Sequence, residues 1–315
     1  MIAIILIALA AGSASALMFA SVISRTLISA LLLYLASMPL MVAAIGWGPL
    51  SATIGGIAAA LGIGAIFGFY HCIAYALTVA LPAWWLGHLA MLGRPTGDGA
   101  EPEPHSLEWY PVGRLLLWIA GFAALITMLT LFSVSTDPEA IVAAMKRSVT
   151  RVLEMHRVEA NERVIGSAAA IAPAIIASGP LIMLTINLWL AAKITATSGR
   201  LKRPWPDLKA TTLPPMTLVV LCVAAAFSFT GGLFALVAKI IVGSLLMAYA
   251  LTGFAVLHTL TLALKNRALW LTCAYAITIL FVWPLLSMVV LGLADTVFGF
   301  RERFMRTRPP PLPTS

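Results

Sequence analysis

Residues 49–69 read PLSATIGGIAAALGIGAIFGF, a stretch without a charged side chain. It exceeds the roughly 18 to 20 apolar residues that a helix needs to cross a bilayer core. Similar blocks fill most of the 315-residue chain, which is 61% hydrophobic, 10% charged and has a mean hydropathy of +0.99. Because backbone polar groups inside a membrane must be satisfied internally, these blocks predict helices. The sequence therefore predicts an all-α, polytopic transmembrane helix bundle and excludes soluble enzymes, β-barrels, disordered chains and secreted disulfide scaffolds.

Charges, prolines and glycine clusters divide the chain into nine candidate apolar helices. They cover residues 2–24, 26–45, 49–69, 71–92, 113–134, 165–197, 213–231, 232–264 and 268–298. We expect about eight crossings in a single transmembrane domain, residues 1–298, followed by a basic, proline-rich tail, residues 299–315, with a P-x-x-P spacing. The polar loop 93–112 is expected to be a solvated linker.

An amphipathic helix is predicted over residues 136–165. Thr136 and Glu139 have the spacing of a capping box, and apolar residues recur at helical intervals from Ile141 onward. Five basic side chains balance five acidic ones, so recruitment by anionic lipid explains the helix poorly. We expect it to lie on the bilayer or to cap the bundle.

The net charge of +8 comes from Lys and Arg residues that lie between apolar blocks, where they orient the chain and contact lipid headgroups. A nucleic-acid partner is therefore not expected. The basic loop 199–212 is typical of a cytoplasmic loop. We predict an even number of crossings, with both termini and this loop inside, the amphipathic helix outside, and one of the three C-terminal segments not crossing fully.

Charged side chains inside the apolar blocks are rare, and such charges are often functional. They are Lys193, Lys239 and Asp295, and each could instead extend to the membrane surface. If 232–264 and 268–298 form an antiparallel hairpin, Lys239 and Asp295 could pair. Asn187 and His258 are buried polar candidates, either for interhelical hydrogen bonds or for a ligand.

Small residues follow one another at intervals of four in the segment quoted above. A stripe of this kind predicts close helix packing, or alternatively a face along which helices slide or a ligand approaches. The Gly46-Trp47-Gly48-Pro49 run before it predicts a helix break with almost no loop. The stripe consists of Ala52, Gly56, Ala60, Gly64 and Gly68.

Catalytic signatures are missing from the sequence. It contains no H-E-x-x-H zinc motif, no P-loop and no second intramembrane carboxylate to form an aspartyl dyad with Asp295. The three cysteines show no metal-binding spacing. We therefore expect no enzymatic activity, no cofactor and no metal.

Several motifs together resemble the YybS-like family of bacterial predicted membrane proteins (domain of unknown function 2232) over nearly the whole chain. They are Met38-Pro39-Leu40, Gly46-Trp47-Gly48-Pro49, the glycine-rich helix, Asn187-Leu188-Trp189, Gly253 to His258, and Gly292 to Asp295 with Arg301. The first four helices are also similar to substrate-capture subunits of energy-coupling-factor vitamin transporters and to MreD. The resemblance implies a multi-pass protein of the bacterial inner membrane without an established activity.

Two functions follow as expectations. The first is a non-enzymatic, transport-related or small-molecule-binding membrane component. The second is a structural scaffold of cell-envelope assembly, with an MreD-like role and a membrane-protein partner. A cavity lined by Asn187 and His258 would favour the first, and a closed bundle with an exposed apolar surface would favour the second.

Overall fold

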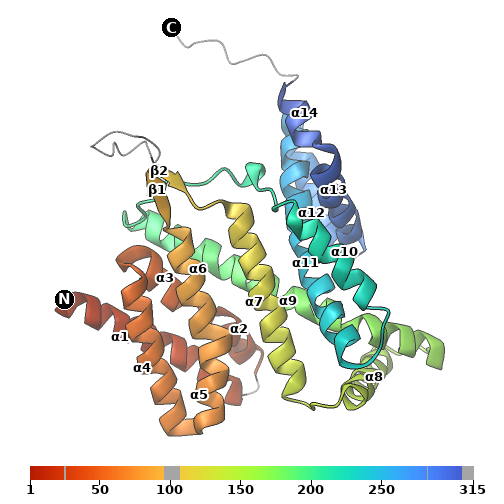
Figure 1. Cartoon of the computed structure of the whole chain (residues 1–315), viewed down its shortest axis with the longest axis horizontal. Helices are drawn as coiled ribbons and strands as arrows, with labels where there is room; N and C mark the ends of the chain where they lie inside the picture. The colour runs from red at the N-terminus through yellow and green to blue at the C-terminus, as the bar shows by residue number, and fades with distance from the viewer. Residues whose placement is uncertain (25, 96–106, 282, 307–315) are drawn as a thin grey trace.

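The computed structural model describes residues 1–24, 26–95, 107–281 and 283–306. Over these residues the chain is a bundle of α-helices with one small two-stranded sheet (Figure 1). Seven segments in the described part are long and apolar enough to cross a membrane: Ile2–Ser24, Leu27–Trp47, Pro49–Phe67, Phe69–Ala90, Val112–Phe132, Glu162–Thr197 and Gly232–Leu260. The predicted all-α bundle of a multi-pass membrane protein is confirmed.

The N-terminal half consists of tightly connected helices. Gly48 and Gly68, with φ of 95° and 93°, each form a one-residue connection, and such backbone angles favour glycine. The predicted break at Gly46 to Pro49 is therefore confirmed. A turn at Ala36 and Ser37 divides the expected helix 26–45, and a π-helical turn, Ala76–Ala80, interrupts the expected helix 71–92. The elements are α1 (Ile2–Ala20), α2 (Leu27–Leu35), α3 (Met38–Trp47), α4 (Pro49–Phe67), α5 (Phe69–Tyr75) and α6 (Leu81–Ala90).

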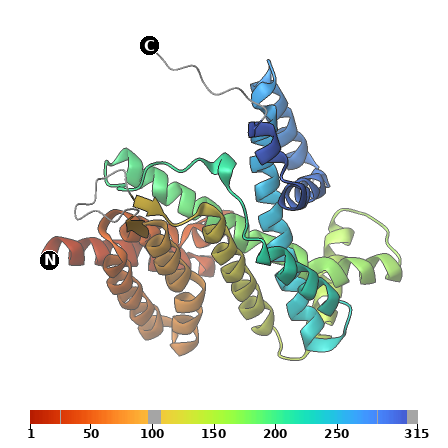
Figure 2. The ribbon, with the colours of Figure 1, turned by 45° about the horizontal axis from the view of Figure 1, so that its top comes forward.

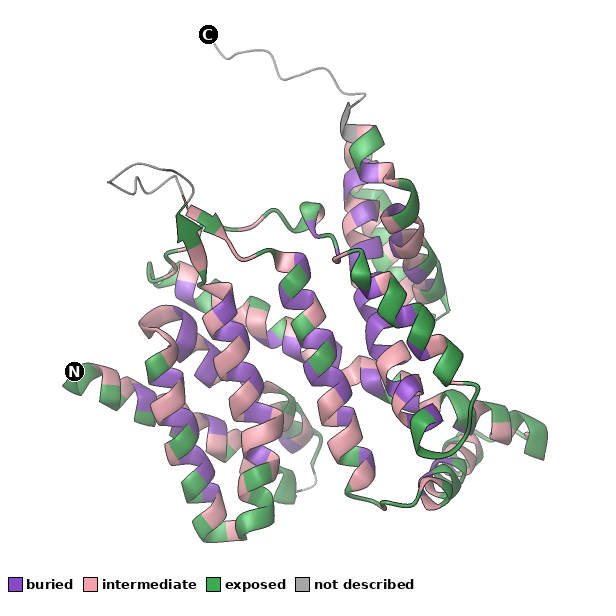
Figure 3. Cartoon of the chain, viewed as in Figure 1, coloured by how far each residue is buried: buried purple, intermediate pink, exposed green. Residues whose placement is uncertain are grey.

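Three long helices, α7 (Val112–Phe132), α9 (Glu162–Thr197) and α11 (Gly232–Leu260), form the centre of the molecule. At 1.5 Å per residue the 36 residues of α9 extend about 54 Å, well beyond the roughly 30 Å of a bilayer core. The helix must therefore tilt strongly or extend out of the membrane. Figure 1 shows it crossing obliquely behind α7. Buried residues, purple in Figure 3, lie along these three helices and along α3, α4 and α6.

The amphipathic helix is shorter than predicted. α8 spans Pro138–Met155, and Arg157, with φ of 55°, lies in the turn that leads to α9. Asp137 caps the helix by accepting from the amides of Glu139 and Ala140, so the predicted capping box of Thr136 and Glu139 is wrong. The short Asp side chain reaches the same orphan amides from one position later. Ile141 and Met145 are buried against α7, α9 and α11, which makes α8 a cap on the bundle.

The expected helix 268–298 is wrong. The chain instead forms α12 (Arg267–Leu280) and α13 (Pro284–Phe298), because Phe281 is extended and Pro284, which lacks an amide hydrogen, begins a new helix. The expected helix 213–231 contains only α10 (Met216–Phe227), whose 12 residues extend about 18 Å, less than a bilayer core. With 12, 14 and 15 residues, α10, α12 and α13 are each too short to cross a bilayer core alone. In Figures 1 and 2 they group around α11, away from α1 to α6.

One end of the bundle carries the strands β1 (Gly93–Pro95) and β2 (Leu107–Trp109), the 3₁₀ turn η3 (Leu208–Ala210) and α14 (Phe300–Arg306), whereas α8 lies at the other end (Figure 1). The strands pair antiparallel, and Arg94 contacts Glu108 at 2.8 Å, so the expected polar loop 93–112 begins and ends as a β-ribbon. Residues 96–106 of that loop and residues 307–315 of the tail, with its P-x-x-P spacing, lie outside the described residues.

Candidate functional site

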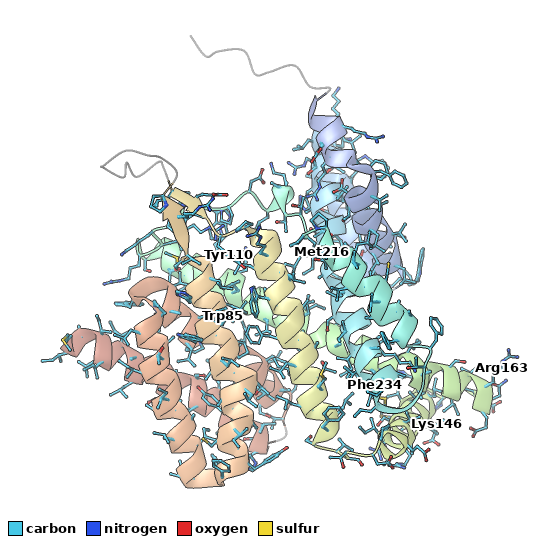
Figure 4. All side chains as sticks on the ribbon, in the orientation of Figure 1. Trp85, Tyr110, Lys146, Arg163, Met216 and Phe234 are labelled. Carbon is cyan, nitrogen blue, oxygen red and sulfur yellow. The ribbon has the colours of Figure 1, made fainter. Side chains whose placement is uncertain are left out.

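A cavity of about 600 Å³ lies at the end of the bundle that carries η3. Its walls come from α7, α9, α11, α12 and the loop 201–211, so segments far apart in sequence meet there. Figure 4 labels Tyr110, before α7, and Met216, at the start of α10, on either side of this region.

The interior of the cavity is mainly apolar. Its lining includes leucine, isoleucine and phenylalanine side chains of α7, α9 and α11, and the indole rings of Trp189 and Trp205 lie in its wall. Pockets that bind small molecules have volumes of about 300 to 1,000 Å³, apolar walls and a few polar groups. The cavity fits this description. The apolar lining includes Leu115, Leu116, Ile119, Leu188, Leu251 and Phe254.

One wall carries a polar cluster formed by α11 and α12. His258 Nε2 lies 2.8 Å from the hydroxyl of Tyr275, and Arg267 Nη2 lies 3.4 Å from His258 Nδ1. The ring of Tyr275 also stacks on Phe254, with ring centres 5.2 Å apart. α12 has no buried residue in the described chain, and this cluster joins it to α11.

Arg203 holds the part of the wall that the loop 201–211 forms. Its guanidinium donates to the carbonyl oxygens of Ala90 and Tyr110, each at 3.0 Å, and so ties the loop to α6 and to the start of α7. Burial lowers the pKa of Arg203 from its usual value, but a guanidinium remains charged at neutral pH. In the same loop Lys209 lies 3.8 Å from Asp207, and both residues line the cavity.

His258 is the predicted candidate that lines this cavity. Lys193 lies at its edge, with the ammonium group 4.5 Å from the ring centre of Trp205 and 6.0 Å from that of Trp189. Asn187 faces elsewhere: it is buried, and its amide nitrogen donates to the carbonyl of Tyr34 at 2.8 Å and to Ser37 Oγ at 2.7 Å. Asn187 and His258 therefore do not share the cavity.

The predicted pair of Lys239 and Asp295 is wrong. Asp295 is buried and accepts from Arg301, whose Nη2 lies 2.7 Å from Asp295 Oδ2. Lys239 lies instead in a separate cleft of about 500 Å³, with Glu139 and Lys146 of α8. The pairing assumed one continuous helix over 268–298, and the break before Pro284 removes that premise.

The small-residue stripe packs closely over most of its length. Ala52, Gly56 and Ala60 are buried, and a Cβ added at Gly56 would lie 3.3 Å from Ala80 Cβ. At Gly64 it would lie 3.0 Å from Cys72 Cβ. Gly68 is not part of this contact, because it is exposed and forms the connection to α5.

The helices α1 and α4 approach each other even more closely, and this contact was not predicted. A Cβ at Gly55 would clash with the carbonyl oxygen of Ala8, and one at Gly12 with the carbonyl oxygen of Gly55. The backbones of α1 and α4 therefore touch along the face next to the predicted stripe. Gly55 precedes Gly56 directly in sequence, and the period of four alone does not tell which of two adjacent glycines faces the partner helix.

Arg267 and Tyr275 are cavity residues that sequence reasoning missed. Arg267 lies between two apolar blocks and reads as an ordinary loop charge, and Tyr275 lies within an apolar block. In the described residues, no group of three or more His, Cys, Asp or Glu side chains could hold a metal ion. Comparison with models of protein families, with curated proteins and with solved structures gave no match to the chain.

Proposed function

We propose that this chain is a non-enzymatic, transport-related component of the bacterial inner membrane that binds a small molecule in the cavity beside α11. The observation that carries the proposal is the cavity itself: apolar walls inside a helix bundle, with the polar groups of His258, Arg267 and Tyr275 on one side. The resemblance to the YybS-like family supports the bacterial inner-membrane location in this proposal.

The proposal is tested by ligand binding to the purified full-length protein. A metabolite library is screened for compounds that raise the melting temperature, since a ligand that binds only the native state stabilises it. Ala255 lines the cavity, and the variant Ala255→Trp should place an indole ring inside it and abolish the shift. The control is Ala65→Trp, because Ala65 is exposed on α4, away from the cavity. Equal shifts in both variants would refute binding at this place.

A scaffold role in cell-envelope assembly is the second candidate, and α12 favours it. This helix buries none of its residues in the described chain, and its side chains Trp270, Ile279 and Leu280 are exposed. A photo-crosslinker at Trp270 distinguishes a membrane-protein partner from lipid. Adducts of a single defined protein would favour the scaffold, and adducts of lipid alone would count against it.

A further inference from the structure

The polar cluster in the cavity wall has unused hydrogen-bond donors. A guanidinium can only donate, so the contact between Arg267 Nη2 and His258 Nδ1 makes Nδ1 the acceptor. The imidazole is then neutral with its hydrogen on Nε2, and it donates to the hydroxyl oxygen of Tyr275. The hydroxyl hydrogen of Tyr275 therefore remains available for another acceptor.

Arg267 also has a donor without an acceptor, although its Nη2 contacts both Nδ1 and the carbonyl oxygen of His258, at 3.4 and 3.5 Å. Its Nε is buried and has no hydrogen-bond partner among the described residues, and no described carboxylate forms an ion pair with its guanidinium. A buried donor without a partner destabilises the protein, and the cost is larger when the donor belongs to a charged group. A negative charge placed beside the guanidinium would offset part of that cost.

The charge of the cavity lining also favours an anionic ligand. Arg203, Lys209 and Arg267 contribute three positive charges, and Asp207 is the carboxylate among the described lining residues. Arg203 is already bonded to two carbonyl groups and Lys209 lies 3.8 Å from Asp207, so Arg267 is the lining cation that has no carboxylate partner among the described residues. Donors and positive charge together select an anion such as a carboxylate or a phosphate.

We infer that the ligand is an acidic amphiphile, whose carboxylate or phosphate group binds Arg267, Tyr275 and Lys209 and whose hydrocarbon part lies against Leu116, Ile119 and Leu188. The inference rests on the proposed function, because it requires the cavity to be a binding site. It adds the chemical class of the ligand. A fatty acid and a phosphate-bearing membrane lipid share this chemistry.

The test uses three probes with an oleyl or oleoyl chain: oleate, oleoyl lysophosphatidic acid and oleyl alcohol. Binding of radiolabelled oleate to the purified full-length protein in a neutral detergent is measured, and the other two compounds compete with it. We expect lysophosphatidic acid to displace oleate and oleyl alcohol to displace it at least tenfold less well, about one unit of log Kd. Stronger binding of lysophosphatidic acid than of oleate would identify the membrane lipid as the source, and the reverse would identify the fatty acid.

Variants locate the headgroup. Arg267→Gln should weaken oleate binding at least about tenfold, because it removes a charge-assisted contact. Tyr275→Phe keeps the ring and should weaken binding about threefold, so it tests the inference even if Arg267→Gln fails to fold. The control is Arg151→Gln on α8, an exposed arginine at the other end of the bundle, which should bind as the unmodified protein does.

Two results would overturn the inference in distinguishable ways. If oleyl alcohol competes as well as lysophosphatidic acid while Ala255→Trp abolishes binding, the cavity binds ligands but does not select acids, and the proposed function stands. If Ala255→Trp leaves oleate binding intact, the cavity is not the site and both proposals fail.

Discussion

Arg301 donates to both oxygens of Asp295: its Nε and Nη2 lie 2.8 and 2.7 Å from Oδ2, and its backbone amide lies 2.9 Å from Oδ1. The remaining nitrogen, Nη1, donates to the carbonyl oxygens of Lys209 and Thr211 at 2.7 and 2.8 Å. Both side chains are buried. Arg301 thus joins the loop 201–211, which lines the cavity, to the end of α13.

Asp295→Asn should destabilise the protein by about 3 to 5 kcal/mol, because it leaves the buried guanidinium of Arg301 without its counter-charge. Chemical unfolding in detergent measures the loss. The double variant with Arg301→Met should be more stable than Asp295→Asn alone, since it removes the stranded charge as well. Losses that simply add in the double variant would contradict an energetic coupling between the two residues.

Gly64→Leu should lower the free energy of unfolding by about 1 to 3 kcal/mol, because the added atoms meet Cys72 across the α4 to α5 contact. Gly62→Leu on the same helix is the matched control, as a Cβ there would meet open space. We expect the control to match or exceed the stability of the unmodified protein, since leucine favours the helix over glycine. Equal melting temperatures for the two variants would show that Gly64 does not face a neighbour.

Asp137→Ala should destabilise α8 by about 1 kcal/mol through loss of its N-cap. Thr136→Ala should have little effect, because Asp137 rather than Thr136 accepts from the helix amides. Hydrogen exchange of the first amides of α8 reports the difference directly. Faster exchange in Thr136→Ala than in Asp137→Ala would instead support a capping box formed by Thr136 and Glu139.

Reporter fusions test the orientation. We expect a cytoplasmic reporter to be active when fused after Lys209 and an export-dependent reporter to be active when fused after Met155, because η3 and α8 lie at opposite ends of the bundle. We predict a cytoplasmic location for the η3 end from the basic residues of the loop 199–212. High activity of the export-dependent reporter after Lys209 would reverse the assignment.

Hydrophobic length predicted the long helices well. The segments around Pro49, Val112 and Gly232 begin within one residue or so of their predicted positions, since proline, glycine and charge mark these boundaries. The break before Pro284 was missed because its flanks are as apolar as a continuous helix. A pattern of apolar residues measures the length of a hydrophobic block, and it does not measure whether one helix or two fill that block.

The candidate site was harder to predict than the fold. His258 stood out as a polar residue in an apolar block, and it does line the cavity. Its partners Arg267 and Tyr275 are brought to it by the turn after α11, which sequence spacing does not specify. Asp295 was singled out as a charge within an apolar block, and its partner lies six residues later rather than on the preceding helix.

The one-residue connections at Gly48 and Gly68 have a consequence for biogenesis. Each connection is a single glycine, so it contains no charged side chain and does not let the two helices that it joins move apart. During synthesis α3 therefore cannot settle in the bilayer independently of α4, and α4 cannot settle independently of α5. The segment from α3 to α6 should enter the membrane as one inserted unit, and lengthening either connection would let its helices integrate in separate steps.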